Sequence, residues 1–186
     1  MHYCCLIITK EFPSNTVIDN VMKPYCEEDF YHNQDENKRP LFMWGYYIVG
    51  GRYLGQLKLK VNQDDDDWKF YSERSRSDYL FRSYLLERFR QYAENSNNVY
   101  SFYEQDYYRG MGLREGFLYV DGAKIADVIN MDRVGCCICV DAEGNAYARE
   151  YYDGQHWIYN EHFDEQVKEV LSKSGDYYAC IVDIHD

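Results

Sequence analysis

The sequence predicts a single α+β domain, a two-layer antiparallel sheet with helices on one face. Three observations support this prediction. The chain has 186 residues, the size of one domain, and no Pro/Gly/Ser-rich linker divides it. Short runs with strand character outnumber runs with helical periodicity. Strands and helices are also interspersed in an order that lets helices pack against one sheet. We expect the arrangement to be ferredoxin-like in character, with an inserted helical segment at about 69–115.

The N-terminal half contains four predicted elements. A β-rich run occupies His2–Thr9, and Ser14 is placed to cap a helix that Pro24 should stop. An aromatic strand is expected over 41–49 and an alternating strand over 56–61.

The inserted segment contains the strongest helical pattern, Ser77–Glu94, with an aromatic and leucine stripe. It is also the only basic stretch of the chain. Its arginines, Arg82 and Arg88 among them, can pair with the acidic remainder or can form a docking stripe for an acidic partner.

The C-terminal half predicts two hairpins, a helix and a strand. The first hairpin turns at Asp121-Gly122, and the second turns within 141–145. Asn160 is expected to cap the helix, which Gly175 closes. A final strand runs over 178–185.

The overall charge narrows the range of partners. Twenty basic and 32 acidic residues leave a net charge of −12, which disfavours generic binding to DNA or to an anionic membrane. We find no signal-peptide pattern and no apolar run of about 18 residues, the length that a membrane span needs. Seven cysteines, an odd number, lie within apolar runs, as expected for reduced thiols in the cytoplasm.

No cofactor and no metal is expected. Cys137 and Cys139, with His156 or His162, are the candidate zinc ligands, but no Cys-x-x-Cys pair accompanies them. The four aspartates at 64–67 lack the alternating spacing of a calcium loop and read as a solvated turn.

Candidate binding residues cluster around two adjacent glycines. Trp44, Arg52 and Tyr53 flank or follow Gly50-Gly51, where the backbone can turn sharply. Arg52 on such a turn can bind a phosphate or a carboxylate through its guanidinium. The structural alternative is a glycine bulge with Arg52 stacked on a tyrosine, and both interpretations stay open.

A second candidate pair is Asp183 and His185, which share one face of the last strand. A carboxylate beside an imidazole can orient a general base. No motif for a nucleophile or a phosphate loop accompanies the pair, so we do not expect an enzyme. The alternative is a nucleotide-binding protein or an enzyme that uses Arg52, Asp183 and His185 to capture or degrade a signalling nucleotide.

Tyrosine is unusually abundant, with 21 residues. Exposed tyrosines are favoured anchors of binding surfaces. Tyr103, Asp106 and Tyr107 interleave aromatic and acidic side chains, as a mimic of nucleic acid would.

Four landmarks together carry a family resemblance. They are Trp44, the segment Ile48-Val49-Gly50-Gly51-Arg52-Tyr53, the Asp141-x-x-Gly144 turn and the ending Val182-Asp183-Ile184-His185. The chain resembles a group of small phage and mobile-element proteins with a tryptophan-rich Gly-Gly-Arg-aromatic motif and a Val-Asp-x-His ending. It departs from that pattern at Gly45, where an acidic residue is expected, and in Lys69–Glu115, which has no counterpart. The resemblance implies a mobile-element setting and a compact α+β fold, and it supplies no activity.

The functional prediction combines charge, tyrosine content and this resemblance. We expect a phage or mobile-element protein that binds and inhibits a host defence enzyme in the cytoplasm, such as a CRISPR-type nuclease or its guide-RNA complex. Such an anti-CRISPR-type protein would act by protein–protein contact and nucleic-acid mimicry.

Overall fold

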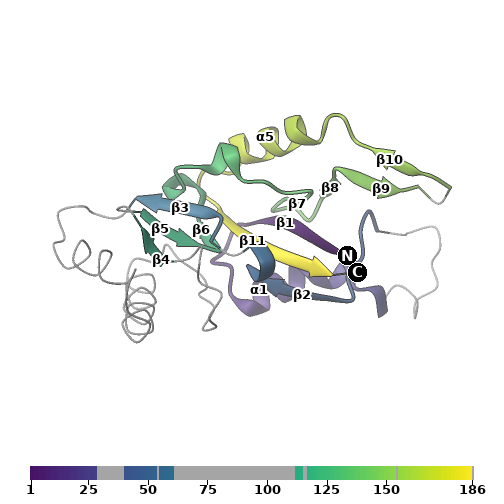
Figure 1. The fold of residues 1–186 in the computed structure, drawn as a ribbon, viewed down its shortest axis with the longest axis horizontal. Coiled ribbons are helices and arrows are strands. Elements are labelled where there is room, and N and C mark those ends of the chain that lie inside the picture. Colours follow the sequence, from purple (N-terminus) through teal and green to yellow (C-terminus); the bar gives the residue numbers. More distant parts are fainter. Residues whose placement is uncertain (29–39, 54, 61–111, 115–116, 154, 186) are drawn as a thin grey trace.

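The computed structural model describes residues 1–28, 40–53, 55–60, 112–114, 117–153 and 155–185 (Figure 1). The predicted helix Ser77–Glu94 and the aspartates at 64–67 lie outside these residues. So do five of the predicted binding residues, Tyr103, Asp106, Tyr107, Arg82 and Arg88. In the part of the chain that is described, no helix is long and apolar enough to cross a membrane.

The centre of the fold is a pair of long antiparallel strands. Strand β1 (His2–Thr9) pairs with β11 (Tyr178–His185) along its whole length, so that His2 lies opposite His185. Both strands were predicted from their apolar patterns, and both are confirmed. The two labelled ends of the ribbon lie side by side in Figure 1 as a consequence.

Four shorter strands complete the central sheet, whose order is β2-β11-β1-β7-β8. Strand β7 (Ile138–Val140) runs parallel to β1, and β8 (Ala146–Ala148) pairs with β7 in a hairpin, as predicted. On the other side, β2 (Tyr46–Val49) and β6 (Gly122–Lys124) pair with different halves of β11. The prediction of a purely antiparallel sheet is therefore wrong, because β1 and β7 are parallel.

The two helices with described contacts cover opposite faces of this sheet. Helix α1 (Asn15–Met22) packs on one core cluster and α5 (Phe163–Lys173) on the other, which Figure 1 shows below and above the sheet. In β1, Leu6 and Ile8 belong to the α5 side, while Ile7 belongs to the α1 side. The predicted two-layer arrangement with helices on one face is wrong, and a ferredoxin-like arrangement is not confirmed. The reason is that β1 is buried on both faces, so each face needs a cover.

Of the two predicted N-terminal helix caps, only one is present in the structure. The Ser14 hydroxyl oxygen accepts from the Val17 N–H at 3.3 Å, so the predicted cap of α1 is confirmed. The predicted cap of α5 is wrong, because His162 precedes that helix. The side chain of Asn160 instead donates to the Ala148 carbonyl at 3.1 Å and so ties the start of α5 to β8.

A second, three-stranded sheet lies beside the first. It has the order β3-β5-β4, formed by β3 (Leu57–Lys60), β5 (Phe117–Val120) and β4 (Gly112–Arg114). The predicted hairpin at Asp121-Gly122 is wrong, because β5 and β6 pair with different sheets. The chain passes from one sheet to the other at Asp121, whose side chain is fully buried and accepts from the Gly55 N–H at 2.7 Å.

One further hairpin stands apart from both sheets. It consists of β9 (Glu150–Tyr152) and β10 (Trp157–Tyr159). Short 3-10 turns occupy Lys23–Tyr25, Gly51–Tyr53, Ile125–Asp127 and Met131–Arg133.

Candidate functional site

The glycine loop that follows β2 wraps around a carboxylate from β11. Gly50 and Gly51 adopt φ values of 71° and 52°, a region that favours glycine. This backbone presents the Arg52 N–H to Asp183, whose Oδ2 accepts it at 2.9 Å. The glycine loop and the end of the last strand therefore meet at Asp183, through the backbone of Arg52 and not through its guanidinium.

The second oxygen of Asp183 binds a residue that sequence reasoning missed. Asp183 Oδ1 lies 2.9 Å from Nδ1 of His2, and the carboxylate side chain is 4% exposed. His2 and Asp183 are separated by 181 positions in the chain. The pairing of β1 with β11 brings them together, since His2 lies opposite His185 and its side chain shares that face of the sheet. A register between the first and last strands is the signal that could have identified His2.

His185 and Tyr46 extend this group of side chains. The His185 ring is 4.7 Å from the His2 ring in an edge-on arrangement, and it stacks on Tyr46 with centroids 4.7 Å apart. Tyr46 is 47% exposed. The Tyr53 hydroxyl donates to the His2 carbonyl at 3.1 Å and holds the start of β1 against the glycine loop. We call His2, Tyr46, Arg52, Asp183 and His185 the histidine site.

The guanidinium of Arg52 is exposed and forms no ion pair with any described residue. The backbone of Arg52 has a structural role, because its N–H binds Asp183, while its side chain is exposed. Of the residues in the alternative prediction, Asp183 accepts from the backbone N–H of Arg52, and His185 lies beside His2, the other partner of Asp183.

Trp44 has a different surrounding. Its indole N–H donates to the Met22 carbonyl at 2.7 Å, and its ring packs edge-on against Tyr47. Trp44 is partly buried and packs against the core on the α1 side, and its hydrogen bond anchors the end of that helix. It does not join the histidine site.

A second candidate surface lies on the β9–β10 hairpin. Trp157 pairs with Tyr152 and Tyr159 pairs with Glu150, so these four side chains share one face of the hairpin. Trp157 is 68% exposed and Tyr159 is 57% exposed. Exposed aromatic groups of this size are typical of binding surfaces.

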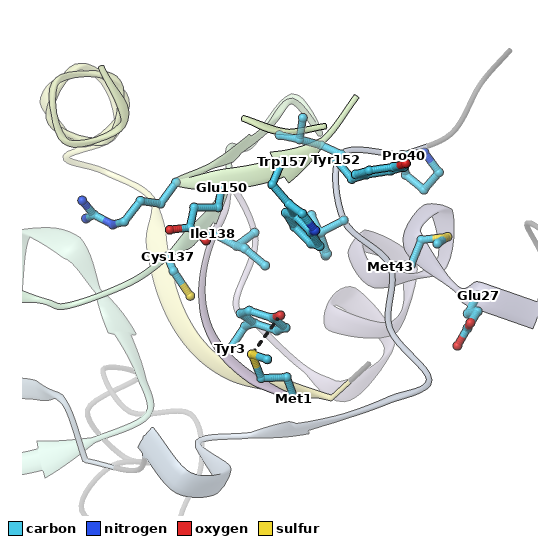
Figure 2. A pocket seen from close by; sticks show the side chains of 13 residues that line it. Met1, Tyr3, Glu27, Pro40, Met43, Cys137, Ile138, Glu150, Tyr152 and Trp157 are labelled. Carbon is cyan, nitrogen blue, oxygen red and sulfur yellow. Dashed lines mark hydrogen bonds between the residues drawn. The ribbon is translucent and has the colours of Figure 1, made fainter. Parts of the chain in front are cut away.

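This face of the hairpin forms one wall of a cavity of about 810 Å³, which we call the aromatic cleft. Figure 2 shows Trp157 reaching into it toward Tyr3. The other lining residues are largely apolar: Met1, Pro40, Leu41, Phe42, Met43 and Ile138. Glu27 and Glu150 contribute carboxylates on opposite sides of the cavity (Figure 2).

Two further residues with polar side chains, Arg149 and Cys137, line the aromatic cleft. Arg149 forms two hydrogen bonds with Asp164, at 2.6 and 3.2 Å, and its guanidinium lies 4.7 Å from the centre of the Phe163 ring. Burial raises the pKa of the Cys137 thiol, which is therefore protonated at neutral pH and is not a ready nucleophile. The lining thus carries two glutamate carboxylates and one guanidinium, which Asp164 pairs.

No protein family, curated protein or solved structure matches this chain. The histidine site and the aromatic cleft are the two candidate functional sites of the described residues. All seven cysteines are free thiols, and the described residues contain no group of three His, Cys, Asp or Glu side chains that could hold a metal ion.

Proposed function

We propose that this protein binds and inhibits a host defence enzyme that handles nucleic acid, with CRISPR-type nucleases as the target class. The observation that carries the proposal is the aromatic cleft, in which exposed aromatic rings lie beside two carboxylates. Its proposed occupant is an arginine- or lysine-bearing loop of that enzyme. In this proposal the protein originates from a phage or mobile element and acts in the host cytoplasm.

The composition of the cleft matches a cationic side chain. An ammonium or guanidinium group binds favourably over the face of Trp or Tyr, within about 6 Å of the ring centre. Trp157 and Tyr152 can supply such faces, and Glu150 lies on the same face of the hairpin. A cation held between rings and a carboxylate gains from both interactions once water is excluded.

The net charge supports the same partner at longer range. A charge of −12 repels nucleic acid and attracts the cationic channels in which nucleases hold it. Complementary charge speeds association and opposes binding to acidic partners. Occupation of such a channel would exclude the substrate without any chemistry by the inhibitor.

The direct test is DNA cleavage by purified CRISPR-type nuclease–guide complexes in the presence of this protein. We expect inhibition that weakens as salt is raised, because the attraction is electrostatic. Trp157→Ala should weaken binding at least about tenfold, since aromatic anchors dominate interface energy. Ile129→Ala is the matched control, because Ile129 is 50% exposed and does not line the aromatic cleft.

Two outcomes would contradict the proposal. One is that no nuclease of the class is bound or inhibited. The other is that Trp157→Ala inhibits as well as the unmodified protein. Thermal unfolding of both variants should match that of the parent protein, because both side chains are largely exposed.

A further inference from the structure

We propose that His2, oriented by Asp183, is the general base of a second site, which hydrolyses phosphate esters. This inference does not rest on the proposed inhibitory function. The two sites lie on opposite faces of β1: Tyr3 lines the aromatic cleft, whereas His2 shares the alternate face with Cys4 and Leu6.

The hydrogen bonds of Asp183 determine which nitrogen of His2 carries the proton. A carboxylate only accepts hydrogen bonds, so the Nδ1 atom at 2.9 Å from Asp183 Oδ1 is the donor. In the neutral ring, Nε2 then has a free lone pair. Asp183 is itself held by the Arg52 N–H at 2.9 Å and is almost fully buried. A buried, anchored carboxylate that orients an imidazole is the arrangement found in general-base catalysis.

The neighbours of His2 favour an anionic ester with an aromatic or nucleobase group. The backbone N–H of Arg52 and the imidazole of His2 bind the same carboxylate, and the Arg52 side chain is exposed. In the proposed site this guanidinium binds the phosphate of the ester. Tyr46 stacks on His185 and is 47% exposed, so its side chain can also contact a ring of the ligand.

The proposed step consumes one water molecule. Nε2 of His2 takes a proton from water as the water oxygen forms a bond to phosphorus. The bond between phosphorus and the ester oxygen breaks, and the leaving oxygen keeps the electron pair and takes up a proton. His2 then returns its own proton to solvent, so that the products are an alcohol and a phosphate with one more hydroxyl group.

The activity test uses untagged protein and two chromogenic esters, bis(4-nitrophenyl) phosphate and 4-nitrophenyl phosphate. Release of 4-nitrophenol from either ester is expected, and the comparison shows whether a diester or a monoester is preferred. His2→Ala should lower the rate at least about 100-fold, the usual contribution of a general base. Arg52→Ala should mainly raise KM, because it removes a contact to the phosphate. His162→Ala is the matched control, since His162 is exposed and pairs with Glu165 on α5.

Nitrogen-15 NMR of the histidine rings provides a readout independent of activity. Neutral His2 should show a protonated Nδ1 and an unprotonated Nε2. The proposal is overturned if neither ester is hydrolysed, if His2→Ala keeps the rate, or if the protonated nitrogen is Nε2. Trp157→Ala should hydrolyse the esters normally, so failure at one site is distinguishable from failure at the other.

Discussion

Gly51 packs so closely against Asp183 that a Cβ atom on the glycine would lie 2.4 Å from the Cβ of the aspartate. The neighbouring Gly50 has the same relation to Asp121, whose Oδ2 would be 2.5 Å from an added Cβ. Two glycines are thus required because two buried carboxylates, Asp183 in β11 and Asp121 between β5 and β6, occupy the space that side chains would need. This fit places the Arg52 N–H on Asp183.

We expect Gly51→Ala to destabilise the protein by at least about 2 kcal/mol. A positive φ costs a non-glycine residue about 1–2 kcal/mol, and overpacking adds about 1–3 kcal/mol. Urea unfolding measures the change. Gly175→Ala is the control, because no atom lies within 4 Å of an added Cβ there, and it should change stability by less than about 0.5 kcal/mol. Equal effects of the two substitutions would contradict the close packing.

Two substitutions at Arg52 test the role of its backbone and the role of its side chain separately. Arg52→Ala keeps the N–H that binds Asp183, so the free energy of unfolding should change by less than about 0.5 kcal/mol. Arg52→Pro removes that donor and should cost about 1–3 kcal/mol, because a buried carboxylate loses a partner. Thermal and urea unfolding of both variants check this. A large loss in Arg52→Ala would mean that the guanidinium itself is structural.

Because of Asp141, we expect the free energy of unfolding to depend on pH under acidic conditions. Burial alone would raise the pKa of its carboxyl, but hydrogen bonds from Asn145, Glu143 and Tyr147 outweigh burial and lower it. Because the folded pKa lies below the ordinary value of 3.8, this stabilisation is complete above that pH and is lost as the pH falls through the folded pKa.

Asp141→Asn should therefore be less stable than the parent protein at pH 7, by about 1–3 kcal/mol, and the difference should shrink in acid. Urea unfolding at a series of pH values measures it. Asp176→Asn is the control, because Asp176 is exposed, and it should follow the parent protein at every pH. A difference that stays constant with pH would refute the assignment.

We expect burial in the core to protect most of the cysteine thiols from alkylation. Burial raises the pKa of Cys136 to about 12 and raises the pKa of Cys139 further, and Cys5 and Cys180 are fully buried. Alkylation with iodoacetamide at pH 8, followed by mass spectrometry, should label at most the two half-buried thiols, Cys26 and Cys137. In urea all seven should react, and a disulfide or bound zinc would contradict this.

Helix caps and turns whose interacting groups lie within a few residues of each other in the chain could be predicted from the sequence. The hydroxyl of Ser14 reaches an N–H three positions later, and Asp141 organises a turn within six residues. In both cases the interacting groups are close in the chain, so the local sequence pattern predicts the contact. The hairpin at Asp121-Gly122 was predicted from the same kind of pattern and is wrong, because pairing with distant strands overrides the local turn preference.

By itself the sequence determined the two long strands, the capped helix α1, the net negative charge and the presence of a glycine turn beside Arg52. The tertiary structure alone decided that α1 and α5 cover opposite faces and that His2 meets Asp183 across 181 positions. The physical reason is that strand pairing is a non-local choice. Each strand offers unpaired backbone groups to several partners, and the burial of both faces of β1 and β11 selects among them. The histidine site exists because that selection sets the first strand against the last in a register where His2 faces the carboxylate.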